Sequence, residues 1–178
     1  MALVQKSPEV FQTEGPISTV GRRELDTLKA AVKASAKGRA RINAHPEATD
    51  ALHEMIIAID PTSYIRPHKH PGKSEAFHIV EGEVDIVVFK DDGEIDGVIE
   101  LGAPDSARPF YYRMSKPLFH TLVIRSEILV VHEITNGPFH PEATIFADFA
   151  PDDCETEKAK AYQSDLARRV AARKETAA

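Results

Sequence analysis

Between Met55 and Ile134 the chain consists of short runs rich in β-branched and aromatic residues, with no helical pattern between them. The runs are MIIAI, EAFHIV, EVDIVVF, EIDGVIEL, HTLVI and EILVVHEI, separated by segments that contain Pro, Gly or Asp. Asp92-Gly93 is a hairpin signal, and Gly82 tolerates the positive φ that a tight turn needs. Six or more strands at this spacing predict an antiparallel sandwich or barrel, so we expect a mainly β fold.

A helical rhythm flanks this region on both sides. Apolar residues three and four apart predict one helix over residues 22–36 and a second over residues 154–174, both packed outside the barrel. The expected division is an N-terminal extension with a helix at residues 1–38, a barrel at 39–150, and a C-terminal helix and tail at 151–178. The apolar residues that carry the two helical patterns are Leu25, Leu28, Val32, Tyr162, Leu166 and Val170.

Bulk composition excludes several classes of partner. The chain has 178 residues, 42% of them apolar, which suits one domain with one core. A formal charge of −6 without a Lys/Arg stripe disfavours nucleic acid, and no segment approaches the roughly 20 apolar residues of a membrane-spanning helix. Cys154 is the single cysteine and cannot form an internal disulfide, so we expect a cytoplasmic location. A small-molecule ligand is the expected partner.

The segment from Ser63 to Glu75 carries a pattern typical of metal ligands. On a strand, residues two apart face the same side with Cα atoms about 6.6 Å apart, so His68 and His70 can aim two imidazoles at one point. The turn at Pro71-Gly72 allows Glu75 to return on the neighbouring strand, and His120 lies in another β run. With eight histidines an isolated H-x-H arises easily by chance, but its extension by Glu75 favours a metal site.

Three imidazoles and one carboxylate form a donor set without sulfur. Such a set suits one divalent transition metal per chain, namely Fe, Mn, Ni, Zn, Co or Cu. It disfavours Mg and Ca, which prefer oxygen ligands. Four protein ligands leave a position for substrate only if the metal takes five or six partners, and this separates a catalytic centre from a closed one.

From His68 to Gly82 the sequence reads H-x-H, four residues, Glu, six residues, Gly. In this it resembles the cupin superfamily. The segments Arg41–His45, SYIRPHKH and HEITNGPF are similar to the WbuC-type small cupin metalloproteins, which are often encoded among bacterial polysaccharide genes. The resemblance covers about residues 39–142 and implies a double-stranded β-helix, the cupin jelly-roll barrel. It also implies metal ligation by His68, His70, Glu75 and His120, and pairing into a homodimer.

The second cupin motif departs from the family pattern, which has Pro-x-Gly before its histidine and Asn four residues after it. This chain has Pro117-Leu118-Phe119-His120, with Ile124 in the Asn position. His120 itself is present, so the fourth ligand is retained. The resemblance therefore does not extend to the turn before this histidine or to the hydrogen bond that the family's Asn would provide.

Strand parity indicates further pocket residues. If the strand runs straight through Pro67, Tyr64 and Arg66 face inward with His68. Arg66 beside Tyr64 suits a carboxylate or phosphate, although a salt bridge at the barrel rim explains Arg66 equally well.

Two residues before the barrel are further candidates for substrate binding. Asn43 and His45 match the WbuC-type pattern in a segment that could close over the pocket, and a turn role fits Asn43 at least as well. In the run EILVVHEI parity leaves open whether His132 or Glu133 faces inward. No catalytic acid or base stands out.

These features predict a metal-dependent enzyme acting on a small polar substrate, acidic or sugar-like. The resemblance links it to bacterial surface polysaccharide metabolism. The alternative is a barrel that binds a metal or a small ligand without turnover, and a third hypothesis is a barrel whose histidines only pack. Exchangeable waters on the metal would favour catalysis, whereas a closed shell in a filled barrel would favour the binding role.

Overall fold

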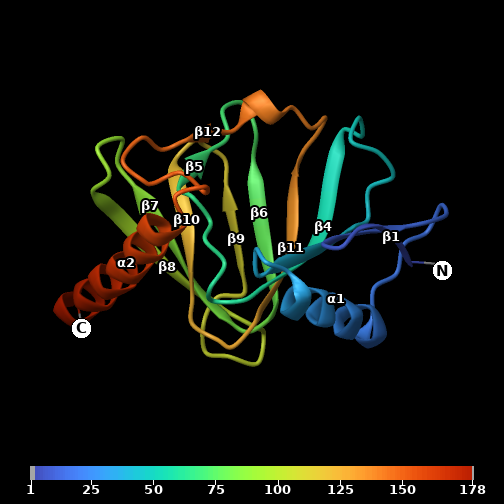
Figure 1. Ribbon diagram of the computed structural model, residues 1–178, viewed down its shortest axis with the longest axis horizontal. Coiled ribbons are helices and arrows are strands. Elements are labelled where there is room, and N and C mark those ends of the chain that lie inside the picture. The colour runs from blue at the N-terminus through green and yellow to red at the C-terminus, as the bar shows by residue number, and fades with distance from the viewer. Residues whose placement is uncertain (1–2, 178) are drawn as a thin grey trace.

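The computed structural model describes residues 3–177, which form two β-sheets and two α-helices (Figure 1). The predicted mainly β fold is confirmed. No helix in this range is long and apolar enough to cross a membrane. In chain order the elements are β1 (Leu3–Ser7), β2 (Val10–Thr13), α1 (Arg22–Ala34), β3 (Arg39–Asn43), β4 (Leu52–Ile59), β5 (His68–Lys69), β6 (Glu75–Glu81), β7 (Glu83–Phe89), β8 (Ile95–Gly102), β9 (Tyr111–Met114), β10 (Phe119–Ile124), β11 (Leu129–Asn136), a 3₁₀ turn (Pro141–Ala143), β12 (Ile145–Phe146) and α2 (Thr156–Ala177).

The eight strands β4 to β11 form a jelly-roll barrel. Within them the first pairs with the last, the second with the seventh, the third with the sixth and the fourth with the fifth, all antiparallel. Further pairings of β11 with β6 and of β10 with β7 complete two facing sheets. A long hairpin rolled up in this way is the jelly-roll topology, so the predicted barrel is confirmed.

Two glycines make the tight turns that the sequence predicts. Gly82 joins β6 to β7 with φ of 87°, and Gly93 precedes β8 with φ of 88°. A side chain is strained in this left-handed region, and at Gly82 a Cβ would also lie 2.4 Å from the carbonyl oxygen of Ile128. Glycine is therefore required at Gly82 by both conformation and space.

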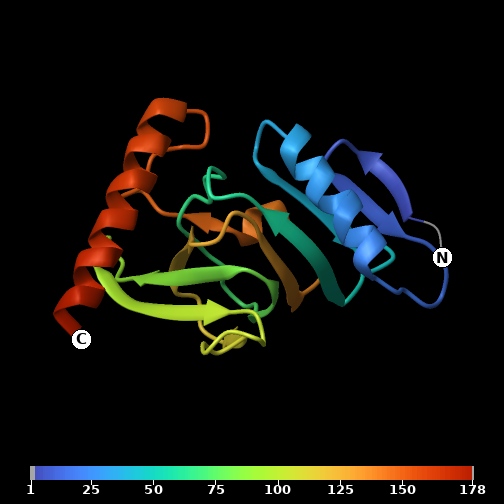
Figure 2. The same cartoon turned by 90° about the horizontal axis from the view of Figure 1, so that it is seen from below.

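Three N-terminal strands extend one sheet beyond the barrel (Figure 2). Strand β3 pairs antiparallel with β4, and β2 pairs with β3 in parallel, so α1 is the crossover connection between β2 and β3. Leu28 and Val32 of α1 pack against Ala40 and Ile42 of β3. The helix is confirmed, whereas β1 and β2 are not among the predicted elements.

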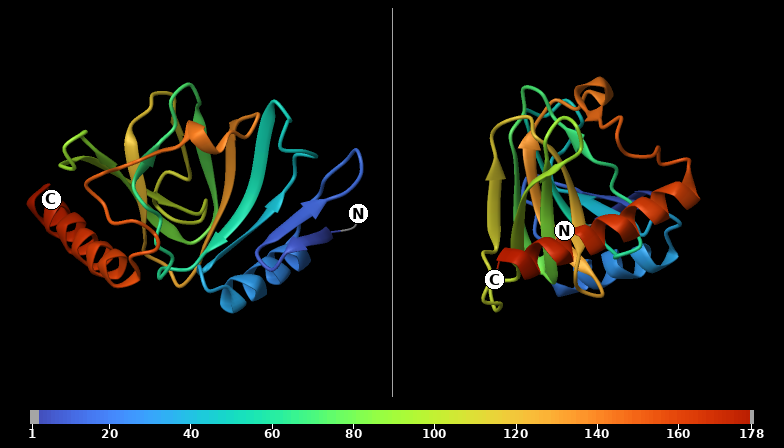
Figure 3. Two further views of the ribbon diagram at one scale, coloured as in Figure 1. Left: turned by 45° about the horizontal axis from the view of Figure 1, so that its top comes forward. Right: turned by 90° about the vertical axis from the view of Figure 1, so that its left-hand side faces the viewer.

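The barrel core lies between the two sheets, and α2 covers the outer face of the smaller one (Figure 3). Phe77 and Ile79 are buried on the same face of β6 as Glu75, while His78 is exposed on the other face. Leu166 and Val170 of α2 pack against Val87, Phe89 and Val123. The second predicted helix is thereby confirmed.

A buried ion-pair network fixes the end of α2 to the barrel. The Asp85 carboxylate on β7 is fully buried and accepts hydrogen bonds from Arg125 Nε at 2.6 Å and Lys174 Nζ at 2.7 Å. Lys174 lies in the last turn of α2, so this contact joins the helix to the sheet. A buried carboxylate needs such partners, because burial of an unpaired charge is costly.

Candidate metal centre

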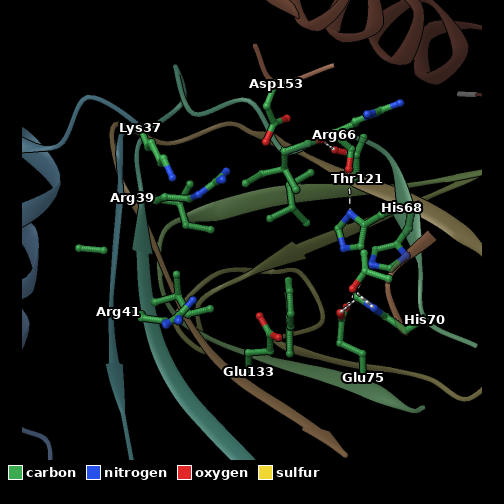
Figure 4. Close-up of a pocket in the computed structure, with 18 of the residues that line it drawn as sticks. Lys37, Arg39, Arg41, Arg66, His68, His70, Glu75, Thr121, Glu133 and Asp153 are labelled. Carbon is green, nitrogen blue, oxygen red and sulfur yellow. Dashed lines mark hydrogen bonds and ion pairs between the residues drawn. The ribbon is translucent and has the colours of Figure 1, made fainter. Parts of the chain in front are cut away.

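The structure brings His68, His70, Glu75 and His120 together between the two sheets. His68 on β5 and His120 on β10 are opposite each other in register, and Glu75 starts β6 in the facing sheet. One donor atom from each of the four lies within 4.8 Å of all the others. Figure 4 shows the side chains of His68, His70 and Glu75 pointing toward one another.

Backbone carbonyls orient two of the imidazoles. The Nδ1 atom of His68 donates to the carbonyl oxygen of Arg66 at 2.8 Å, and that of His120 donates to Leu118 O at 3.0 Å. A carbonyl oxygen can only accept, so Nδ1 carries the proton in both rings and the lone pair of the neutral ring is on Nε2. Such a second hydrogen bond is typical of histidines that bind metals.

The Glu75 carboxylate is buried and lies between two of the histidines. Its Oε1 is 3.3 Å from His120 Nε2, and its Oε2 is 3.5 Å from His70 Nε2. Tyr112 of β9 donates its hydroxyl to Oε1 at 2.5 Å. Burial alone would raise the pKa of Glu75, but the contacts with His120, His70 and Tyr112 outweigh it and hold the pKa below its ordinary value. Glu75 is therefore ionised.

Protonation of the other groups follows from the same burial. Desolvation, with a smaller effect of His120, lowers the pKa of His68 to about 4, so this ring is neutral at neutral pH. Burial opposes a charged His120, but its contact with Glu75 prevails and raises the pKa of His120. A proton therefore competes with a metal ion for His120.

The donor set fits a divalent transition metal. Two ligands bound to one ion at about 2.1 Å lie about 3 to 4 Å apart, and the spacings of Glu75 from His70 and His120 fall in this range. Three neutral nitrogens and one carboxylate suit a borderline metal better than Mg or Ca. Among residues 3–177 these four form the one group of histidine, cysteine and carboxylate side chains with such spacing.

A cavity of about 510 Å³ opens beside the cluster. In Figure 4 His68, His70 and Glu75 lie along one side of it, Lys37, Arg39 and Arg41 lie along the other, and Glu133 lies between them. A second cavity of about 360 Å³ shares Arg41, His70 and Glu133 with the first. The two hollows therefore meet at residues that belong to both.

The remaining predicted site residues are placed differently. Arg66 lines the larger cavity, but its guanidinium donates to Asp152 Oδ2 at 2.7 Å and to Ala147 O at 3.1 Å. The contact with Asp152 is a salt bridge, which is the second of the two explanations that the sequence allows for Arg66. The Tyr64 hydroxyl donates to Pro151 O at 2.9 Å, and Tyr64 lines neither of the two cavities. Residues 63–67 are not a strand, so the parity that brought Tyr64 inward does not apply.

Asn43 and His45 line the smaller cavity rather than the metal cluster. His45 is buried and stacks on His53 with ring centroids 4.1 Å apart. Asn43 Nδ2 donates to Gln12 Oε1 at 3.5 Å. A role for these two residues in substrate binding stays a prediction.

Of His132 and Glu133, between which strand parity could not decide, Glu133 is the one that faces the cavity. It lines both cavities, whereas His132 faces the other way, with Nε2 3.6 Å from Glu54 Oε1. Thr135 is the register partner of Glu75, so Glu133 is its diagonal neighbour, at a Cα distance of about 7–8 Å. Burial and the charge of Glu75 raise the pKa of Glu133 to about 8.

The H-x-H and Glu of the first motif thus lie inside a jelly-roll barrel, with the third histidine on the strand that pairs with the first. The fold is cupin-like. A family model described as a domain of unknown function (DUF6016) matches residues 20–101, which include His68, His70 and Glu75 but not His120. No curated protein matches the sequence.

Several solved structures overlap with the chain. Protein SO0799 from Shewanella oneidensis has 10% identity and a TM-score of 0.47, with 58% of this chain and 66% of that chain covered. An oxalate decarboxylase from Bacillus subtilis, described with Mn(II) centres, has 18% identity and a TM-score of 0.43, with 55% of this chain covered. The match spans just under two thirds of the first and 24% of the second. Strand order and the ligand cluster, rather than these overlaps, identify the cupin-like barrel.

Proposed function

We propose that the protein is a metal-dependent cupin enzyme that acts on a small polar substrate. The observation that carries this proposal is the cluster of four donors beside a cavity of about 510 Å³. A cavity of this size accommodates a small molecule. A metal needed only to stiffen the barrel would not require such a cavity beside it.

The residues around the cluster have distinct roles in this proposal. A divalent metal bound there would act as a Lewis acid toward a substrate oxygen. Tyr112 orients the Glu75 carboxylate, and the carbonyl contacts of His68 and His120 hold the proton on Nδ1, so that both Nε2 atoms would be available to an ion. Glu133 is the candidate general acid or base, because it lines the cavity, and in the metal-free protein burial and the charge of Glu75 raise its pKa to about 8.

Elemental analysis of protein purified without a histidine tag tests the metal site. We expect nearly one transition metal ion per chain in the parent, and its loss in His68→Ala and in His120→Ala. The matched control is His78→Ala, because His78 is exposed on the outer face of β6. Metal-free parent protein after reconstitution, or metal retained in both ligand variants, would refute the proposal.

Water exchange distinguishes an enzyme from a barrel that only binds metal. The proton relaxation rate of water, measured with Mn(II) bound, reports whether water molecules coordinate the ion directly. The enzyme requires at least one exchangeable water, because the substrate needs an open coordination position. A closed shell would favour the alternative, a non-catalytic metal- or ligand-binding barrel.

The finer expectations from the sequence stand with this proposal as predictions. They are the affiliation with WbuC-type small cupins, the link to surface polysaccharide metabolism, the cytoplasmic location, the homodimer, and the division at residues 38 and 150. The identity of the metal among Fe, Mn, Ni, Zn, Co and Cu belongs with them. Light scattering tests the homodimer, and the elemental analysis identifies the ion.

A further inference from the structure

Three cationic side chains line the cavity across from the metal ligands. They are Lys37, Arg39 and Arg41, which lie in and just before β3 (Figure 4). Strand β3 lies outside the eight-stranded barrel and pairs with its edge strand β4. The barrel therefore contributes the metal ligands, and the added strand contributes the positive wall.

Packing of α1 determines which face of β3 carries the charges. Ala40 and Ile42 are buried beneath α1. Because side chains alternate along a strand, Arg39 and Arg41 lie on the opposite face, which is the cavity side. Figure 4 shows both arginines and Lys37 on the same wall.

Among residues 3–177 no carboxylate forms an ion pair with these three cations, although the charge of Arg41 acts on Glu133 and partly offsets the rise in its pKa. Neither Lys37 nor Arg41 has an ion pair within 4 Å there, and Arg39 donates to Tyr64 O at 2.9 Å, a neutral carbonyl. Arg66, in contrast, is paired with Asp152. The acids that line the same cavity are Glu9, Glu75, Glu133 and Asp153.

Two of those acids have other roles. Glu75 belongs to the ligand cluster, and Glu9 accepts a hydrogen bond from Ser35 at 2.8 Å. The other two, Glu133 and Asp153, form no ion pair with the three cations among the described residues. The cations are therefore available to an anion that enters the cavity. A bound divalent metal would make the cavity still more positive.

The strand order sets the distance between the wall and the metal ligands. Strand β3 is separated from β6, which carries Glu75, by β4 and β11. At about 4.8 Å per strand, the backbones of β3 and β6 are about 14 Å apart. The side chains reach inward from both ends, so a small molecule with two polar ends can span the remaining gap.

We propose that Lys37, Arg39 and Arg41 bind an anionic group of the substrate, a carboxylate or a phosphate, while another group of the same molecule reaches the metal. The substrate is then a small acid rather than a neutral sugar. This inference rests on the proposed function, because it assigns the substrate class of the same cavity. Guanidinium groups suit both anions, since each can accept two parallel hydrogen bonds.

Isothermal titration calorimetry on metal-loaded protein tests the anion subsite. The probes are succinate for a carboxylate, inorganic phosphate for a phosphate, and succinamide as the neutral counterpart of succinate. We expect succinate or phosphate to bind and succinamide not to bind. Arg41→Gln and the double variant Arg39→Gln/Arg41→Gln should weaken binding by about 10- to 100-fold, as expected for loss of a charge-assisted hydrogen bond.

Two controls isolate the effect of the wall. Arg168→Gln removes an exposed arginine on α2 and should leave anion binding unchanged. Arg41→Lys retains the charge and should recover part of the affinity. Circular dichroism confirms that each variant is folded, and elemental analysis confirms that its metal content equals that of the parent.

Three results would overturn the inference. These are no binding of succinate or phosphate, equal binding of succinamide, or equal anion affinity in the parent and in the double variant. The same titrations on metal-free protein separate this inference from the proposed function. Anion binding that persists without metal and is lost in the double variant would support the wall even if the metal proposal fails.

Discussion

Replacement of Tyr112 by phenylalanine removes one hydroxyl from the metal site and leaves the surrounding packing in place. The Tyr112 hydroxyl donates to Glu75 Oε1 at 2.5 Å, and both residues are buried. The Tyr112 ring also packs on Phe77 with centroids 5.3 Å apart, a contact that phenylalanine retains. The substitution therefore tests one hydrogen bond to a candidate ligand without altering a ligand itself.

The expected loss of metal affinity follows from the strength of that bond. A hydrogen bond to a charged group contributes about 1.5–3 kcal/mol, and 1.4 kcal/mol corresponds to about a factor of ten in affinity. Outer contacts of metal ligands typically affect affinity by about 10–100-fold. We therefore expect Tyr112→Phe to bind the metal about 10- to 100-fold more weakly than the parent. Burial and the charge of Glu75 raise the pKa of Tyr112 well above its ordinary value. The hydroxyl therefore stays protonated, and donates to Glu75, at any pH near neutral.

Competition with a chelator of known affinity measures the metal dissociation constant. The matched control is Tyr111→Phe, on the same strand but exposed on its outer face, where its ring contacts His78. This control should bind the metal as the parent does. Equal affinity in Tyr112→Phe and Tyr111→Phe would show that Glu75 needs no support from Tyr112, and would refute its role in orienting the ligand.

Three further substitutions test the fold and the cavity. Asp85→Asn should lower the free energy of unfolding by about 3 kcal/mol in a denaturant titration, because it removes the buried charge that Arg125 and Lys174 share and leaves Lys174 only its ion pair with Glu100. Asp91→Asn, at an exposed ion pair, should change it little. Gly82→Ala should lower the thermal midpoint, since its Cβ would lie 2.4 Å from a carbonyl oxygen; an unchanged midpoint would contradict this. Glu133→Gln should retain its metal. In metal-free protein the folded state holds a proton on Glu133 up to a pKa of about 8, above its ordinary 4.5, so the parent should lose stability relative to Glu133→Gln as the pH rises between these values. A constant difference in denaturant titrations across that range would contradict the burial of Glu133.

The barrel and the metal ligands were predictable because each leaves a local signal. Short β runs with Gly82 and Gly93 at the turns are typical of antiparallel strands, and both glycines adopt positive φ. His68, His70 and Glu75 lie within eight residues, so the H-x-H spacing and the turn at Pro71-Gly72 relate them, although β5 itself ends at Lys69. His120 required the resemblance, because its pairing with His68 depends on how the hairpin rolls up.

Other parts of the site and of the fold could not be predicted, because they depend on long-range pairing or lie in strands too short to show a pattern. Tyr112 reaches Glu75 because β9 pairs with β6, a relation that no local pattern carries. Strands β1 and β2 have five and four residues, too few for a clear alternation. The prediction for Tyr64 extended a strand that begins only at His68.

The division between barrel and added strand explains why the motif indicates a metal but not a substrate. The H-x-H motif and its partners are part of the eight-stranded topology, so their geometry follows from the barrel. Arg39 and Arg41 are charged residues on an added strand, and in the sequence they look like solvent-exposed positions. Only the packing of α1 on the other face of β3 shows that they face the cavity. Metal retention and anion selectivity should therefore vary independently. Substitutions in β3 should change which molecule binds while the metal content stays constant. Substitutions of the histidines should remove the metal while the preference for an anion over its neutral counterpart remains.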